Sequence, residues 1–273
     1  MNAELWQSVI LGIVQGLTEF LPVSSSGHLH LVREFFFPGG LNTEDNLLFT
    51  VTVHGGTALA TVVIFYKDIL HIFKGLFQGK RDERQFAWAI VVSMLPAAFI
   101  GYYFNDLIKN FFEAGAGTTF LVAAMLVLTG LLLMLASRAK QTHKKVSTAD
   151  AVIIGIAQAI AILPGISRSG ATISTSVLLG IDRERAARFS FLMVVPLILG
   201  KMALDSKELY ENPSAIEGQN LLPLLVGFAA AFLTGLWACK AMIAWVKKSK
   251  LSYFAIYCFA VGALATIGMV VRS

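Results

Sequence analysis

Two interruptions in apolar segments of this sequence gather the residue types that bind and transfer anionic groups. The first spans residues 19–28 and reads Glu-Phe-Leu-Pro-Val-Ser-Ser-Ser-Gly-His. The second spans residues 163–170 and reads Leu-Pro-Gly-Ile-Ser-Arg-Ser-Gly. A charge embedded among apolar residues is costly and is retained mainly for function or for pairing. We therefore expect the carboxylate, imidazole, guanidinium and hydroxyl groups of the two stretches to form a site.

Each serine and glycine cluster has the composition of an anion-binding loop at the start of a helix. Free backbone N–H groups and the helix dipole attract anions there, while serine suits the N-cap and glycine lets the backbone approach a ligand. The expected loop residues are Ser24, Ser26, Gly27, Ser167, Ser169 and Gly170. Arg168 adds a planar fork of donors that matches phosphate oxygens.

The other side chains of the two stretches could carry out phosphoryl transfer, which needs a charge-stabilising environment and an activated nucleophile. Ser25 and His28 are three residues apart, close enough to interact around one helical turn. Either Ser25 activated by His28, or His28 itself, could attack phosphorus. Glu19 could bind a divalent cation whose shell is completed by diphosphate oxygens, or it could orient His28. Gln15 precedes Glu19 by four residues and would share its helix face.

Structural roles are open for the same residues. Ser24 and Ser26 could only cap a helix. Arg168 could be the structural partner that neutralises Glu19. His28 could be a satisfied core histidine, although its nearness to Glu19 and to the serines favours a functional role.

The composition is that of an integral membrane protein. Of the 273 residues, 56% are hydrophobic and 14% are charged, against about 25% charged in soluble domains. The net charge of +5 comes without a basic stripe interleaved with aromatics, so we expect no nucleic-acid partner. Because the N-terminus lacks a basic region and a cleavage site, we expect its first apolar segment to be retained. Six segments are long enough to span a bilayer, at residues 47–66, 86–104, 119–137, 187–204, 221–246 and 252–271.

Two further apolar segments, at residues 5–17 and 151–163, are shorter and end at the proline and serine interruptions. Runs of this length favour re-entrant segments over full spans, and broken backbone at membrane depth is tolerated where it is buried in protein or lines a wet cavity. A kinked spanning helix is the alternative. We predict re-entrance for both segments.

The two interrupted stretches resemble each other at a constant offset of 143 residues. The matching residues of the first stretch are Gly12, Ile13, Gln15, Ser24, Ser26 and Gly27. Each stretch precedes three spanning segments, which predicts one membrane domain, 1–273, built from repeats at 1–137 and 151–273. Since three is odd, the second repeat must be inverted relative to the first. The predicted fold class is therefore all-α and polytopic, with two inverted-topology repeats, each a re-entrant helix pair plus three transmembrane helices.

The distribution of lysine and arginine predicts the orientation. One side of the membrane receives the cations of the connections at 67–84, 138–145, 183–188 and 247–250. The other side receives Arg33, Lys109, Lys201, Lys207 and Arg272. The positive-inside rule makes the first side cytoplasmic, so we expect both termini and the opening of the first interruption outside. With eight full spans, the termini would still share a side.

Residues 15–28 and 164–172 resemble the undecaprenyl-diphosphate phosphatase family, also called the bacitracin-resistance family. Both stretches are long and specific, and the stretch from Phe189 through Pro196 is also similar. The resemblance implies two inverted repeats with re-entrant pairs, and removal of the terminal phosphate of undecaprenyl diphosphate to give the lipid carrier that cell-wall synthesis recycles. It implies Mg²⁺ or Ca²⁺ as a cofactor and an active site open to the periplasmic side of the bacterial inner membrane.

Carried over by position, the resemblance assigns Glu19 to an acidic motif, Ser25 and His28 to a catalytic loop, and Arg168 to phosphate binding. Thr172, within the second matching stretch, joins the expected substrate-binding residues. Many family members have glutamate where this chain has Gln15. Glutamine could still ligate a metal beside Glu19 but cannot act as a base, which puts any mechanism with two carboxylates here in doubt.

Two other functions compete with a phosphatase acting on a long-chain prenyl diphosphate. Inverted repeats with re-entrant helices also occur in transporters, so the same cavity could carry an anion or flip a lipid phosphate. A purely structural scaffold would leave Glu19, His28 and Arg168 unexplained. A homodimer is compatible with the sequence, which does not determine the oligomeric state.

Overall fold

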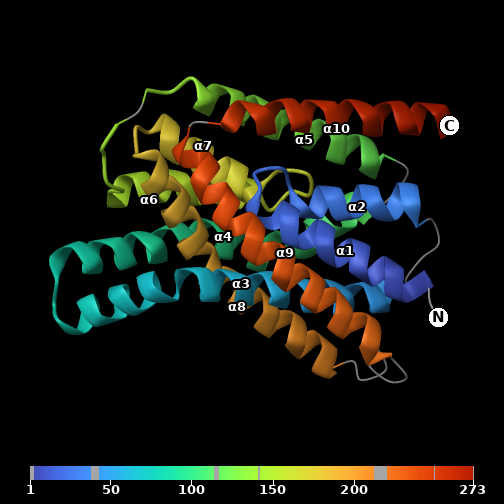
Figure 1. Ribbon diagram of the computed structural model, residues 1–273, viewed down its shortest axis with the longest axis horizontal. Coiled ribbons are helices and arrows are strands. Elements are labelled where there is room, and N and C mark those ends of the chain that lie inside the picture. The colour runs from blue at the N-terminus through green and yellow to red at the C-terminus, as the bar shows by residue number, and fades with distance from the viewer. Residues whose placement is uncertain are drawn as a thin grey trace.

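The computed structural model describes residues 3–37, 43–113, 117–140, 142–211, 220–248 and 250–272. Within these ranges the protein is all-helical, and its only β-type pairing is an isolated bridge between Lys144 and Ile181 (Figure 1). The long helices are α3 (Thr43–Phe77), α4 (Arg81–Glu113), α5 (Thr118–Ser137), α8 (Arg183–Glu211), α9 (Leu221–Lys247) and α10 (Leu251–Arg272). The short helices are α1 (Ala3–Phe20), α2 (Ser25–Phe36), α6 (Thr148–Ile160) and α7 (Arg168–Leu178).

Six helices are long and apolar enough to cross a membrane, and each contains one of the six predicted segments. The candidate spans are Leu48–Phe77, Arg81–Phe104, Thr118–Ser137, Arg183–Leu204, Leu221–Lys247 and Leu251–Arg272. The first is longer than predicted, because α3 continues past Tyr66 through charged residues that lower hydropathy without breaking a helix. The extended ends of α3 and α4 form a helical hairpin that projects from one end of the protein (Figure 1).

The short helices come in two consecutive pairs, each separated by a break. The apolar segment predicted at residues 5–17 lies in α1, which runs on to Phe20 and so carries Gln15 and Glu19 on a helix. After the break, α2 runs back toward the end of the protein from which α1 came (Figure 1). The segment predicted at 151–163 lies mostly in α6, which ends at Ile160 before a second break and α7.

Glycines bring the short helices close to their neighbours. Helix α1 packs on α9, and α6 packs on α4. A Cβ atom added to Gly12 would lie 2.4 Å from the carbonyl oxygen of Gly227, and one added to Gly155 would lie 2.6 Å from that of Ser93. Small residues permit such close backbone approach in membrane bundles. Positions 12 and 155 are equivalent in the two similar stretches, so both use the same kind of contact.

The two breaks lie against each other. A Cβ atom on Gly27 would lie 3.2 Å from the Cα atom of Gly165, and one on Gly170 would lie 3.2 Å from the carbonyl oxygen of Pro22. The contact is reciprocal, because Pro22 and Gly165 are also equivalent positions at the offset of 143 residues. The functional side chains of one stretch are thereby brought next to those of the other.

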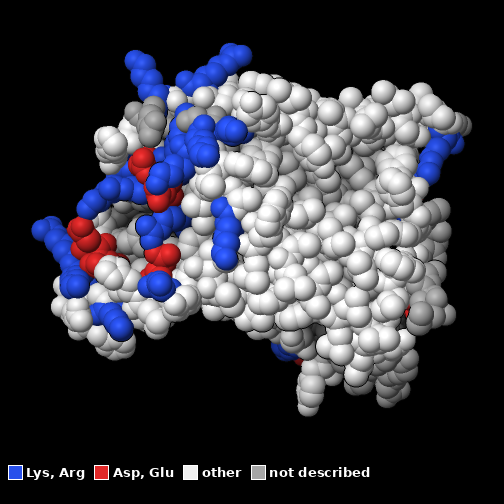
Figure 2. Space-filling model, viewed as in Figure 1, with Lys and Arg blue, Asp and Glu red and all other residues white. Residues whose placement is uncertain are grey.

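Charged residues gather at the end of the protein opposite the two chain ends (Figures 1 and 2). Ion pairs between different elements join this end, linking Lys145 to Asp82, Arg188 to Asp68, and Lys247 to Glu184. The cations predicted to be cytoplasmic therefore share one end of the structure.

Candidate functional site

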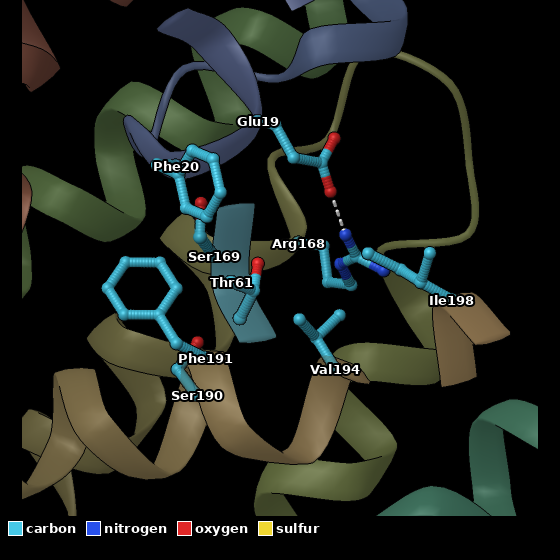
Figure 3. Close-up of a pocket in the computed structure, with 9 residues that line it drawn as sticks. All are labelled: Glu19, Phe20, Thr61, Arg168, Ser169, Ser190, Phe191, Val194 and Ile198. Atoms are coloured by element: carbon cyan, nitrogen blue, oxygen red, sulfur yellow. Dashed lines mark hydrogen bonds and ion pairs between the residues drawn. The ribbon is translucent and has the colours of Figure 1, made fainter. Parts of the chain in front are cut away.

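The carboxylate of Glu19 joins the two breaks. Glu19 lies in the last turn of α1, and its Oε1 atom forms an ion pair with Nη2 of Arg168, the first residue of α7 (Figure 3). The Glu19 side chain is only 6% exposed, whereas that of Arg168 is 30% exposed. A buried carboxylate requires such a partner because desolvation would otherwise disfavour its charge. The sequence suggested that Arg168 could pair with Glu19, and the structure shows this contact.

The second oxygen of Glu19 accepts hydrogen bonds from two polar side chains of α1 and α2. The Ser25 hydroxyl donates to Oε2 at 2.7 Å, and the Gln15 amide donates to the same atom at 3.1 Å. The Gln15 amide also lies 3.5 Å from the Thr57 hydroxyl of α3. Glu19 is thus placed to hold Ser25 directly and to accept its proton, since hydrogen-bond contact is the geometry that general-base catalysis requires.

His28 has a different set of partners from the one that the sequence suggested. Its Nδ1 atom lies 2.8 Å from the carbonyl oxygen of Ser24, one turn back, and its Nε2 atom lies 2.9 Å from the Tyr257 hydroxyl of α10. Neither nitrogen bonds to Ser25 or Glu19 among the contacts of the described residues. The bond to the Ser24 carbonyl oxygen holds the ring toward α10. His28 therefore forms a hydrogen bond with neither Ser25, which it was expected to activate, nor Glu19, which could have oriented it.

A pocket opens beside the ion pair. Its lining residues are Glu19, Phe20, Thr61, Arg168, Ser169, Ser190, Phe191, Val194 and Ile198. Figure 3 shows the guanidinium between the Glu19 carboxylate and the apolar side chains of Val194 and Ile198. The pocket therefore combines a cation and hydroxyls with an apolar wall, as a site for a charged head carried on an apolar chain would require.

The serine and glycine clusters cap their helices in the same way. Ser24 accepts from the backbone N–H of Gly27 at 3.2 Å, and Ser167 accepts from that of Gly170 at 3.0 Å. These two glycine N–H groups are therefore already bonded. The first two N–H groups of each helix have no intrahelical acceptor, so these are the ones that could donate to an anion. In α7 they belong to Arg168 and Ser169.

The remaining predicted residues differ in their relation to the pocket. Ser169 lines it and donates to the carbonyl oxygen of Leu21 at 3.3 Å. Ser26 is exposed next to Ser25 and lies 3.4 Å from the Ser24 hydroxyl. Thr172 is fully buried, donates to the carbonyl oxygen of Arg168 at 2.9 Å and lies 2.6 Å from the Ser190 hydroxyl. It does not line the pocket itself but contacts Ser190, which does.

Sequence reasoning missed several residues around the site. Thr57 and Thr61 lie one turn apart on α3 and face Gln15 and the pocket respectively. The sequence signal that could have indicated them is the spacing of two hydroxyl residues four apart within a spanning segment. No local pattern marked Tyr257, which lies 229 residues beyond His28 in the sequence. Its position depends on the packing of α10 and could not be read from spacing.

Few groups are available to hold a metal. Among the described residues, no group of three or more His, Cys, Asp or Glu side chains is arranged to bind one. The carbonyl oxygen of the Gln15 amide is buried and has no hydrogen-bond partner there, although its NH₂ group is bonded. An unpaired buried amide oxygen beside a carboxylate is a donor set that suits a hard cation taking its other ligands from substrate and water.

Comparison with known proteins identifies the family. The chain is 54% identical to an undecaprenyl-diphosphatase of Christiangramia forsetii, over 97% of this chain and 98% of that protein. It is 48% identical to the undecaprenyl-diphosphatase of Bacteroides thetaiotaomicron, over 96% and 97% of the two chains, and 42% identical to that of Carboxydothermus hydrogenoformans, over 94% of each. The family model described as bacitracin resistance protein BacA matches residues 8–264. Having this match over nearly its whole length, the chain belongs to the bacitracin resistance protein BacA family.

Proposed function

We propose that this protein is a membrane phosphatase that hydrolyses undecaprenyl diphosphate to undecaprenyl phosphate and inorganic phosphate. The product is the lipid carrier that peptidoglycan synthesis reuses. The main support is the ion pair between Glu19 and Arg168, two residues that line one pocket. The same Glu19 carboxylate accepts the Ser25 hydroxyl, so a base, a serine and a guanidinium lie together. The relatives are named as hydrolases of this substrate. Neither observation favours the transporter alternative.

Arg168 and the start of α7 bind the diphosphate. Nη2 of Arg168 bonds to Glu19, and the partly exposed guanidinium has further N–H donors for phosphate oxygens. The apolar wall formed by Phe191, Val194 and Ile198 lies on the same pocket and accommodates the first part of the prenyl chain. Charge on the phosphoryl oxygens is stabilised by donors that are already in place, which is how most phosphoryl-transfer sites lower the barrier.

Ser25 is the nucleophile that the geometry supports best. Its hydroxyl donates to Glu19 at 2.7 Å, so Glu19 takes the proton as the Ser25 oxygen forms a bond to the terminal phosphorus. The bond between that phosphorus and the bridging oxygen breaks, and undecaprenyl phosphate leaves with the bridging oxygen. Water then hydrolyses the phosphoserine and releases phosphate. His28, whose Nε2 atom has the ring's lone pair, is the second candidate nucleophile.

A divalent cation, Mg²⁺ or Ca²⁺, would be held by Glu19 and by the unpaired amide oxygen of Gln15. When bound, it would neutralise charge on the diphosphate oxygens. The site offers the cation only one carboxylate. Substrate oxygens and water would therefore supply most of the ligands of the cation.

We further propose that the two short-helix pairs are re-entrant and belong to inverted repeats. Support comes from the equivalent caps at Ser24 and Ser167, from the equivalent glycine contacts of α1 and α6, and from the reciprocal packing of the two breaks. The charged end, opposite the chain ends, is the cytoplasmic end by the positive-inside rule (Figure 2). The site then opens to the periplasmic side of the bacterial inner membrane. Assembly as a homodimer stays a prediction.

Phosphate release from undecaprenyl diphosphate by the purified protein in detergent tests the function. We expect release in detergent, where no sealed compartment exists, and its loss when a chelator removes the cation. Flux of a lipid phosphate in sealed vesicles without hydrolysis would contradict the phosphatase. Full activity in the presence of the chelator would contradict the cation.

A further inference from the structure

We propose that Tyr257 is a positioning residue that holds the His28 imidazole in one tautomer and orientation; this inference rests on the proposed function, with His28 as its second candidate nucleophile. Tyr257 lies on α10, remote in sequence from both breaks. Its hydroxyl is 2.9 Å from Nε2 of His28. The two rings are nearly parallel, with an interplanar angle of 9° and centroids 5.5 Å apart.

The other partner of His28 determines which ring nitrogen carries the proton. A backbone carbonyl only accepts hydrogen bonds, so Nδ1, at 2.8 Å from the carbonyl oxygen of Ser24, must be the protonated nitrogen. In the neutral ring, Nε2 is then an acceptor, and the Tyr257 hydroxyl donates to it. Nε2 carries the only nitrogen lone pair of the neutral ring. The Tyr257 hydroxyl fixes the direction of that lone pair, and this bond must break when Nε2 attacks phosphorus or takes a proton.

The packing of α10 fixes Tyr257 in this place. The adjacent residue, Cys258, is fully buried, and its Sγ atom lies 3.9 Å from the carbonyl oxygen of Pro22 in the first break. One face of α10 packs on α5, while Tyr257 itself remains 44% exposed. A tyrosine needed only for packing would not require its hydroxyl to reach a histidine that is 8% exposed. The hydroxyl therefore has a specific partner. The packing of α10 against the first break keeps Tyr257 and His28 in contact.

Substitution of Tyr257 by phenylalanine tests the role, with Tyr253→Phe as the matched control. Tyr253 lies one turn earlier on α10, is 66% exposed and has its ring near Lys250. We expect Tyr257→Phe to lower kcat for phosphate release about tenfold, the effect of one lost hydrogen bond to a catalytic group, with KM changed less than twofold. Tyr253→Phe should leave both constants unchanged. An unchanged or raised kcat in Tyr257→Phe would overturn the proposal.

A double-variant comparison separates positioning from a general structural effect. If Tyr257 acts through His28, then adding Tyr257→Phe to His28→Ala should change kcat by less than twofold. A further tenfold loss would show that Tyr257 acts independently and would overturn the inference. Full activity of His28→Ala alone would also overturn it, since a dispensable histidine needs no positioning.

A spectroscopic measurement tests the contact without relying on activity. In protein with ¹⁵N-labelled histidine, we expect His28 as the Nδ1–H tautomer, with its signal identified by its loss in His28→Ala. Tyr257→Phe should shift the Nε2 resonance, and Tyr253→Phe should not. If the unmodified protein released no phosphate, the proposed function would fail, but the resonance would still decide whether Tyr257 holds the imidazole. An Nε2–H tautomer or an unshifted resonance would overturn the inference.

Discussion

The carboxylate of Glu19 and the guanidinium of Arg168, which are 149 residues apart in the chain, form an ion pair across the two helix breaks. The same carboxylate accepts the Ser25 hydroxyl on its other oxygen. One buried side chain thus aligns a cation from the second break with a hydroxyl from the first.

Replacing Arg168 by alanine should lower kcat/KM for phosphate release by about 10²- to 10³-fold, because a donor aimed at the transferring phosphoryl group is lost. Arg168→Lys should retain more activity than alanine but less than arginine, since an ammonium cannot bond to Glu19 and phosphate in a planar fork. Steady-state kinetics in detergent measure both. Arg185→Ala, a variant of an arginine at the charged end, is the control, and undiminished activity in Arg168→Ala would remove the site assignment.

Ser25→Ala should abolish the covalent step and reduce kcat by at least about 10³-fold, as expected for removal of a nucleophile. Mass spectrometry of protein quenched during turnover should detect a phosphate on Ser25. Ser137→Ala, which removes a hydroxyl at the end of α5, is the matched control. If Ser25→Ala kept more than about a tenth of the activity, or if phosphate were trapped on His28, then His28 would be the nucleophile.

Gln15→Glu should tighten cation binding, because a second carboxylate beside Glu19 adds charge to the proposed ligand set. We expect the Mg²⁺ concentration for half-maximal activity to fall about tenfold, since ligand charge tunes such sites. Gln78→Glu makes the same change at the exposed charged end and should have no effect. An unaltered Mg²⁺ dependence in Gln15→Glu would place the cation elsewhere.

Gly165→Ala should destabilise the protein more than Gly180→Ala does. Both glycines have positive φ, at 93° and 81°, which costs about 1–2 kcal/mol for a residue with a Cβ atom. Only at Gly165 would the new Cβ atom also collide, at 2.8 Å from Met125 Cβ and from the carbonyl oxygen of Val122. Overpacking adds about 1–3 kcal/mol. Thermal unfolding in detergent measures the difference, and equal melting temperatures of the two variants would contradict the close packing of the second break.

Much of the architecture could be predicted because helices that span a bilayer require long apolar segments, which are easily recognised in a sequence. The six spans were predicted correctly, since each needs a long apolar run. The segment predicted at residues 47–66 ended too early, because hydropathy falls at Lys67 and Asp68 although the helix continues to Phe77. The contact between Glu19 and Arg168 was predictable, because an unpaired charge among apolar membrane segments is costly.

The orientation of His28 could not be predicted from the sequence. Its spacing from Ser25 permits a contact around one turn, but the imidazole instead bonds to the carbonyl oxygen of Ser24 and to Tyr257. Which of these contacts forms depends on where α10 packs, and that is a property of the tertiary structure. The family resemblance was confirmed by the match over residues 8–264, whereas the cation and the roles of the site residues stay predictions.

At the offset of 143 residues that relates the two breaks, the counterpart of Ser25 is Arg168. Each is the first residue of its helix and follows a serine cap whose hydroxyl accepts from the glycine N–H three residues on, although the backbone φ is 71° at Ser24 and −74° at Ser167. Under the proposed duplication and the proposed mechanism, one ancestral position would have diverged into the nucleophile in one copy and the phosphate-binding cation in the other. Two identical copies would present two serines or two arginines, so under this scheme turnover could begin only after duplication had allowed the halves to differ.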